Sequence, residues 1–337
     1  PARYYKGGKP DLQLFDKKLY EVNPDDKVAI ARAAAEEVLG KDERIISVDS
    51  SYSDGEGSSY RLISNGFEGE SKSTWFSVSA SVSIKGEGEA RPQDYWYDSA
   101  LFYDKLTKTG IGAKALERVL RKLGQKKAKS GKYTMVVDPM NVGNLLSPML
   151  SALYGSALQQ KNSFLMDKLD TKVASDLFTL RDEPHAIGAN GSRYFDNEGV
   201  ATEPRTVFDK GVLKTYFIDT YNGKKMDIAP TISAPSRLIL TPGDKDLNGL
   251  VADIKQGILV TGFNGGNSNS STGDFSYGIE GFLIEDGKLT QPVNEMNVTG
   301  NMVTLWNSLV AVGNDPQPNR SWQIPSLVFE GVDFSGL

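Results

Sequence analysis

The scarcity of metal-binding and cross-linking side chains constrains this chain more than any motif does. The sequence contains no cysteine and one histidine, His185. Without cysteine, no disulfide, thiolate metal site or iron–sulfur cluster can form, and one histidine cannot supply a His₃ or His₂Glu zinc site. The fold must therefore be held by buried apolar side chains, and 337 residues are enough for about two domains with cores of their own.

The charge balance excludes a second group of functions. The 43 acidic and 38 basic side chains give a net charge of -5, whereas nucleic-acid binding needs a clustered basic excess. We interpret the longest basic run, Lys122 to Lys129, as a solvated helix end. Because of this charge balance, we expect no direct nucleic-acid partner. No run of about 18 apolar residues exists, so we expect no membrane partner either. The absence of cysteine is compatible with the cytoplasm, where we expect the protein to be located.

The first third of the chain predicts a small mixed α/β domain over residues 23–129. Residues 1–22 are expected to be a linker that follows an N-terminal domain outside this sequence. Asn23 and Pro24 are typical of a helix start. The helix that follows is expected to bury one apolar stripe, made of Val28, Ala31, Ala35, Val38 and Leu39. Alternating β-rich runs follow at 44–52, 59–64 and 74–84, with a hairpin turn at Asn65-Gly66. A second helix is predicted over 111–123.

A domain boundary is predicted near residue 130, before a larger β-dominated domain over 130–337. Tyr133–Val137 has the pattern of a buried strand, and apolar residues between Leu145 and Tyr154 recur at helical spacing. Two similar hairpins are expected at 206–215 and 282–290, and further helices at 247–256 and 302–312. The expected fold class is α+β, with a barrel- or sandwich-like second domain that carries a few helices.

Two segments of the sequence are candidate functional sites. The stretch Gly262 to Asp274 contains Gly265 and Gly266, and its backbone N–H groups are a weak candidate for an anion cradle. It lacks the Walker and Rossmann patterns, and a long surface loop that lines a substrate site is the favoured interpretation.

The other segment surrounds His185. The histidine is either a lone acid–base group or, by our preference, a structural residue bonded to the backbone. The carboxylates available to orient it lie close in sequence: Asp182, Glu183, Asp196 and Glu198. The composition of Asp196 to Gly199 also predicts a turn in which the aspartate side chain bonds the backbone.

Several motifs in order resemble the TldD/PmbA family, also called modulators of DNA gyrase. They are Val136-Val-Asp-Pro139, Phe195 to Val207, Gly211 to Tyr216, Gly265 to Phe275, and Gly281 to Gly287. The resemblance covers about 130–337 strongly, and 23–125 is similar to the family's middle domain. The family forms a heteromeric cytosolic protease, and its TldD branch holds zinc with His-Glu-x-x-x-His and a C-terminal cysteine.

This chain departs from that zinc pattern at every ligand. The aligned positions of the His-Glu-x-x-x-His motif run from Ser147 to Ala152, and the degenerate metal-site positions are Ser147, Pro148, Ser151 and Ala152. The resemblance therefore implies no metal or other cofactor in this chain, with zinc only in a TldD-like partner.

Pro184-His185 and Gly191-Ser192, placed before Phe195 to Gly199, match the PmbA (TldE) branch. That branch implies a non-metallated subunit, paired with a zinc-bearing TldD-like homologue or with itself, that handles unfolded peptide. Family roles include peptide-antibiotic maturation and antitoxin degradation. The candidate residues of a peptide cleft are His185, Arg193, Asp196, Glu198, Gly265 and Gly266. Two alternatives stay open: a regulatory or peptide-binding protein without a peptidase partner, and an autonomous hydrolase that uses His185.

Overall fold

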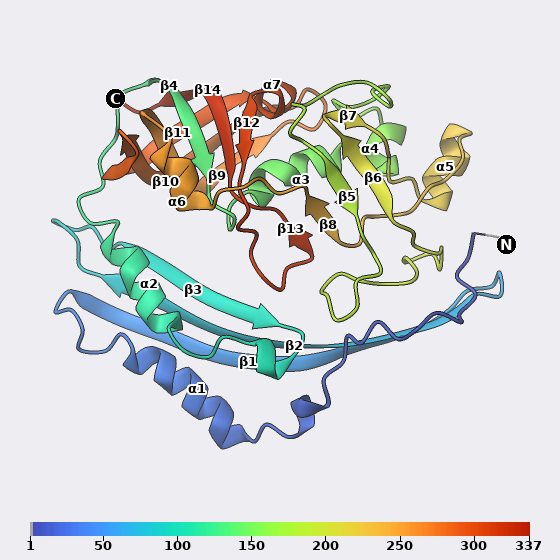
Figure 1. The fold of residues 1–337 in the computed structure, drawn as a ribbon, viewed down its shortest axis with the longest axis horizontal. Helices are drawn as coiled ribbons and strands as arrows, with labels where there is room; N and C mark the ends of the chain where they lie inside the picture. Colours follow the sequence, from blue (N-terminus) through green and yellow to red (C-terminus); the bar gives the residue numbers. More distant parts are fainter. Residues whose placement is uncertain (1–2) are drawn as a thin grey trace.

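The computed structural model describes residues 3–337 and has the expected α+β class. Figure 1 shows a three-stranded sheet with one helix below it and another beside its left end, and two further sheets with short helices above it. Residues 55–62 and 68–75 form a long two-stranded ribbon, which extends from the lower sheet beneath the upper part. No helix in residues 3–337 is both long and apolar enough to cross a membrane.

The lower part is built around a central antiparallel hairpin. Its sheet has the order β1-β2-β3, and the turn at Asn65-Gly66 is confirmed, with Gly66 at φ 92°. The two runs expected at 44–52 and 59–64 form one continuous strand instead, because the pairing of β1 with β2 is unbroken from Val48 to Leu62. The elements are η1 (Lys17–Tyr20), α1 (Pro24–Glu36), β1 (Ile45–Leu62), β2 (Glu68–Ile84), β3 (Gln93–Ala100), η2 (Tyr103–Lys105) and α2 (Ile111–Leu120).

Strand β2 explains why both helices pack on one side of this sheet. Alternate side chains of a strand point to opposite faces, and the apolar set of β2 is at most 1% exposed: Phe76, Val78, Ala80, Val82 and Ile84. Residues of α1 and α2 complete this core. The opposite face of β2 carries serines at 77, 79, 81 and 83, and it is left uncovered by the two helices.

Helix α1 starts as predicted but buries a narrower face. The Asn23 side chain accepts a hydrogen bond of 2.8 Å from the Asp26 backbone N–H. Ala34 and Val38 face the core, whereas Val28 and Leu39 of the expected stripe are 54% and 58% exposed. The stripe prediction was wrong at its two ends, because the face that packs on the sheet and on α2 carries Ile30, Ala34 and Val38 instead.

The upper part contains a ring of strands beside an open sheet. The first sheet has the order β11-β10-β9-β4-β14-β12, and a further pairing of β11 with β14 closes five of its strands into a barrel-like ring. The second sheet has the order β13-β8-β5-β6-β7. The strands are β4 (Gly131–Val137), β5 (Leu180–Asp182), β6 (Arg205–Asp209), β7 (Val212–Leu213), β8 (Leu238–Leu240), β9 (Gln256–Ser268), β10 (Asp274–Glu285), β11 (Lys288–Asn301), β12 (Leu309–Val312), β13 (Trp322–Gln323) and β14 (Leu327–Ser335).

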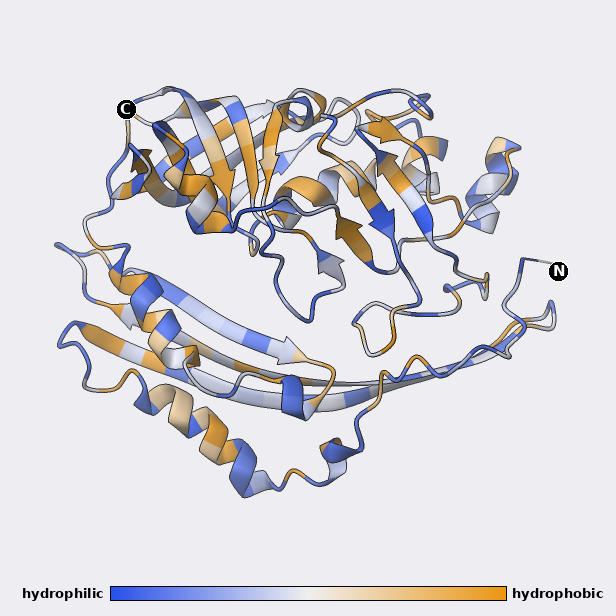
Figure 2. Ribbon diagram, viewed as in Figure 1, coloured by the Kyte–Doolittle hydropathy of each residue, from blue (hydrophilic) through white to orange (hydrophobic). Residues whose placement is uncertain are grey.

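One large core joins the ring to the second sheet. Trp306 is fully buried and packs on Phe178 at 4.4 Å and Phe329 at 5.5 Å between ring centres. Figure 2 shows long apolar stretches on the upper strands and on α3, whereas β3 and much of the ribbon are polar. The helices of this part are α3 (Gly143–Ser151), α4 (Gly155–Gln159), α5 (Thr220–Met226), α6 (Leu247–Ala252) and α7 (Met302–Asn307).

Two segment predictions were wrong in this part. The glycine-rich stretch expected as a long surface loop belongs largely to β9, which runs to Ser268, because its backbone pairs with β10. The helix expected over 302–312 ends at Asn307, since Leu309 to Val312 pair with β14 as strand β12. The two similar hairpins at 206–215 and 282–290 are present.

The basic run that begins at Lys122 was also misassigned at its first residue. Lys122 is 8% exposed, and its Nζ lies 2.7 Å from Glu280 Oε1 and 3.2 Å from Asp94 Oδ2. Because Glu280 belongs to β10 and Asp94 to β3, the lysine joins the lower and upper parts rather than facing solvent.

Candidate functional site

A pocket of about 660 Å³ lies along the exposed side of α3, and we call it the α3 pocket. Helix α3 contributes Ser147, Pro148 and Ser151 to its lining, and the hairpin of β9 and β10 and strand β13 form the other walls. The lining residues from those walls are Ser268, Ser270, Tyr277 and Trp322. Three of the four degenerate metal-site positions therefore line one pocket.

Local bonds fix α3 at this place. Asp138 follows β4 and accepts hydrogen bonds from the Asn141 backbone N–H at 3.0 Å and from its side chain at 2.6 Å. Asn141 also donates to the Thr261 carbonyl of β9 at 2.8 Å. Burial raises the pKa of Asp138, and the bonds from Asn141 oppose that rise. The helix is thus tied at its start to two strands of the ring.

The α3 pocket does not suit a zinc ion. Zinc in proteins takes sulfur, imidazole or carboxylate ligands, whereas Pro148 has no donor side chain and Ser147 and Ser151 offer only neutral hydroxyls. Ala152 is 1% exposed and lies in the core, not in the pocket. Within residues 3–337, no group of three or more histidine, cysteine, aspartate or glutamate side chains could hold a metal ion.

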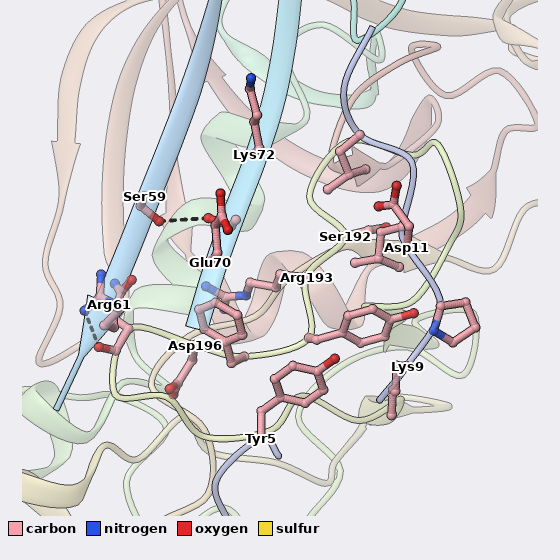
Figure 3. A pocket seen from close by; sticks show the side chains of 17 residues that line it. Tyr5, Lys9, Asp11, Ser59, Arg61, Glu70, Lys72, Ser192, Arg193 and Asp196 are labelled. Atoms are coloured by element: carbon pink, nitrogen blue, oxygen red, sulfur yellow. Dashed lines mark hydrogen bonds between the residues drawn. The ribbon is translucent and has the colours of Figure 1, made fainter. Parts of the chain in front are cut away.

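A second pocket, of about 430 Å³, lies between the ribbon and the segment 192–197; we call it the ribbon pocket. Figure 3 shows its mixed charges, with Lys9 and Asp11 from the N-terminal segment, and Arg61, Glu70 and Lys72 from the ribbon. The ribbon is held in place beyond it, because Phe67 packs on Phe195 at 5.1 Å and Arg61 donates to the Asn197 carbonyl.

Arg193 and Asp196, two of the predicted cleft residues, both line the ribbon pocket. Arg193 donates to Ser236 Oγ at 2.8 Å and to the carbonyls of Ala234 and Pro235 at 2.8 and 3.1 Å. Burial lowers the pKa of Arg193, and the charge of Asp196 opposes that effect. These bonds hold the guanidinium against the segment 234–236, so its role includes shaping the wall.

Asp196 forms the turn that its sequence predicts. It is 2% exposed, and its carboxylate accepts from the backbone N–H groups of Glu198 and Val200 at 2.9 Å and of Ser233 at 3.0 Å. These three bonds fix the loop between Phe195 and Val200.

His185 bonds a threonine rather than a carboxylate. Its Nε2 lies 3.0 Å from Thr202 Oγ1, and that hydroxyl donates to the Arg193 carbonyl at 2.5 Å. Because the single hydroxyl proton is used in the second bond, Nε2 must carry the proton in the first. Burial, helped by Lys9, lowers the pKa of His185. None of the four carboxylates considered as orienting groups is bonded to the ring.

Glu198, Gly265 and Gly266, the remaining predicted cleft residues, are absent from the linings of both pockets. Glu198 accepts from the backbone N–H and the hydroxyl of Thr220 at 2.9 Å each, at the start of α5. Gly266 has φ 95° and lies against the Ser276 carbonyl, where a Cβ atom would be 2.1 Å from the oxygen. It serves the pairing of β9 with β10.

Sequence reasoning missed the other walls of these pockets. Trp322 and Tyr277 carry no motif, and only the pairing of distant strands brings them to α3. The serine alternation of β2 was a readable signal for a polar sheet face, and Ser71 and Ser73 of that face line pockets beside Arg193.

Comparison with protein families covers most of the chain. Residues 17–123 match the model described as PmbA/TldA metallopeptidase central domain, and residues 130–336 match the PmbA/TldA metallopeptidase C-terminal domain. These matches define a metallopeptidase-related protein. The chain belongs to the PmbA/TldD family.

Individual relatives agree with that membership. The chain is 30% identical to the metalloprotease PmbA homolog of Haemophilus influenzae and 28% identical to metalloprotease PmbA of Escherichia coli O157:H7, in each case over 97% of this chain and 73% of the relative. A solved structure called "putative modulator of DNA gyrase", from Bacteroides thetaiotaomicron, has a TM-score of 0.99 and 73% identity over 100% of this chain and 77% of that one.

Proposed function

We propose that this chain is a non-metallated, PmbA-type subunit that binds extended peptide and acts in proteolysis through a zinc-bearing TldD-like partner. The observation that carries this proposal is that the α3 pocket of a metallopeptidase-related fold is lined by no histidine, cysteine, aspartate or glutamate. Peptide-bond hydrolysis by a metallopeptidase needs a metal to activate water, and the residues at Ser147, Pro148 and Ser151 cannot hold one. The cytoplasmic location implied by the family resemblance is part of the proposal.

Assignment to the PmbA branch is supported by the share of this chain that the relatives of each branch match. The PmbA relatives match over 97% of this chain, whereas a metalloprotease TldD homolog of Buchnera aphidicola matches over 60% at 25% identity. A partner of the TldD type, or a second copy of this chain, would complete the assembly.

Strand β13 offers a place for peptide backbone. It is the last strand of its sheet and pairs only with β8, so no other described strand occupies its second edge. Added strands give affinity through backbone hydrogen bonds and specificity through pockets for alternate side chains. Trp322 of β13 lines the α3 pocket, which gives one such pocket.

The alternative of an autonomous hydrolase is disfavoured by the bonds of His185. A histidine general base is normally oriented by a carboxylate or a comparable acceptor, and here Nε2 is occupied by Thr202. Peptide binding without a peptidase partner remains the second candidate, since β13 and the α3 pocket would serve it equally.

Co-expression with a TldD-like homologue tests the proposal. We expect the two chains to co-purify and the pair to cleave an unfolded peptide, whereas this chain alone does not. A partner variant that lacks its zinc ligands is the matched control, and it should abolish cleavage by the pair. Cleavage by this chain alone would contradict the proposal, and failure to co-purify or cleave would favour the second candidate.

A further inference from the structure

A cleft of about 490 Å³ between the lower and upper parts carries an unusual charge pattern, and we call it the cationic cleft. Its lining includes Lys105 at the end of η2, Arg237 before β8 and Arg320 before β13, and it includes no aspartate or glutamate. The protein as a whole is acidic, with a net charge of -5. A cleft lined by three cationic side chains and no acidic one is therefore unusual for this protein.

The cationic groups of this cleft have no anionic partner in the described chain. Among residues 3–337, no ion pair or side-chain hydrogen bond is formed by Lys105, Arg237 or Arg320, although many other lysines and arginines are paired. The Nε atom of Arg237 is buried and unpartnered. Glu183, whose charge acts on Arg237, is itself paired with Arg181 at 2.7 Å.

Arg320 is held in the cleft by an aromatic ring rather than by an acid. Its guanidinium lies 4.5 Å from the ring centre of Tyr97 on β3. That contact leaves the planar edge of the guanidinium, with its N–H donors, free for a ligand. A buried donor without a partner costs free energy, and Arg237 Nε is such a donor, so an anion bound in the cleft would stabilise this arrangement.

The walls of the cationic cleft are fixed before any ligand arrives. The Gly188 backbone N–H donates to the Leu12 carbonyl at 2.7 Å, and Asn190 donates to the Asn319 carbonyl at 3.2 Å. Gly191 has φ 86°, and a Cβ there would lie 2.7 Å from Ser321 Cβ. Gln323 donates to the Arg320 carbonyl at 2.6 Å. These bonds preorganise the site and reduce the entropy lost on binding.

We propose that the cationic cleft binds a carboxylate of the extended peptide, a site that rests on the peptide-binding role proposed above. Arginine pairs with carboxylates through two parallel N–H···O bonds, and Arg237 and Arg320 supply the donors. Gln323 lines this cleft and Trp322 lines the α3 pocket. A peptide on the free edge of β13 would therefore reach one pocket on each side of the strand. The carboxylate comes from the peptide C-terminus or from an aspartate or glutamate side chain.

Four labelled peptides test this assignment on the full chain. They share one twelve-residue Gly/Ser/Leu sequence and differ in a free or amidated C-terminus and in two internal Glu or Gln residues. Binding is followed by fluorescence anisotropy at low and high NaCl for the wild type, R237Q, R320Q and K105Q. R32Q, which removes one exposed charge from α1, is the matched control. Thermal melts establish that each variant is folded, and exposed Lys105 gives a variant with little structural role.

The wild type should bind a carboxylate-bearing peptide about tenfold more tightly than its neutral counterpart, with loss of that preference in R237Q and R320Q and at high salt. The C-terminal and side-chain pairs identify the source of the carboxylate. R32Q should behave as the wild type does. Equal binding of all four peptides would overturn this site and leave the peptide-binding role intact, whereas no binding of any peptide would overturn both.

Discussion

Lys122 and Glu280 form a 2.7 Å ion pair that connects the turn after α2 in the lower part to β10 of the upper part. Both side chains are largely buried, at 10% and 17% exposed, and Asp94 and Arg118 extend the cluster. The two parts that this pair joins also form opposite walls of the ribbon pocket and of the cationic cleft.

Removal of Lys122 should be costly. The substitution K122M leaves Glu280 without its partner, and loss of one member of a buried pair costs about 3 kcal/mol or more of unfolding free energy. K127Q is the control, because the pair of Lys127 with Glu295 is exposed and should contribute less than about 1 kcal/mol. Urea denaturation followed by fluorescence measures both, and equal effects of the two substitutions would refute a structural role for the junction.

Asp196 should be essential to the ribbon pocket. D196A leaves three backbone N–H groups without their acceptor, and we expect a loss of about 3 kcal/mol. D244A, at an exposed position, should change stability by less than about 0.5 kcal/mol. Thermal melting compares the two. A neutral effect of D196A would mean that the loop 195–200 is held by other contacts.

The close packing of α1 on α2 predicts a sharp difference between two glycines. A Cβ at Gly112 would lie 1.9 Å from the Ala34 carbonyl oxygen, whereas one at Gly143 meets nothing within 4 Å. G112A should therefore destabilise the chain by about 2 kcal/mol or more, and G143A should be neutral or slightly stabilising. Chemical denaturation of both variants checks the prediction, which fails if their midpoints shift alike.

The lone histidine gives a pH prediction. Because burial lowers the pKa of His185, the folded state binds its proton less readily than the unfolded state does. The contribution of His185 to stability is thus complete above about pH 6.5 and falls as the pH drops below that value. Relative to H185Q, the wild type should lose thermal stability between pH 7.5 and 5.

A direct measurement accompanies that comparison. A single histidine gives one imidazole C2–H resonance, so NMR titration reads its pKa without assignment. We expect a value below that of an unstructured histidine, and a slightly lower value still in the carboxylate variant E183Q, because the charge of Glu183 opposes the effect of burial. A value above the reference would show that an acid governs the ring, as the autonomous-hydrolase alternative requires.

The sequence predicted local elements better than their packing. The Asn23 cap, the Asn65-Gly66 turn and the Asp196 turn depend on neighbours in the chain, and all three are present. Lys122 was misassigned because its partner Glu280 lies far away in sequence, and no charge pattern along the chain identifies such a pair.

The candidate site was predictable only in part, because some of its side chains come from segments that lie far apart in sequence. Alignment of motifs predicted Ser147, Pro148 and Ser151, and these residues share one pocket. The side chains opposite them come from β10 and β13, whose approach to α3 depends on the tertiary fold. Gly266 was predicted to line the cleft because of its residue type, but its positive φ is explained by the pairing of β9 with β10.

Metal analysis of the purified protein tests whether this chain carries a catalytic metal of its own. The purified chain is equilibrated with zinc, freed of excess metal by gel filtration and measured by mass spectrometry, with a portion assayed on an unfolded peptide. We predict substoichiometric zinc and no cleavage. One zinc ion per chain, together with cleavage that a chelator abolishes, would show instead that this chain is itself a zinc peptidase.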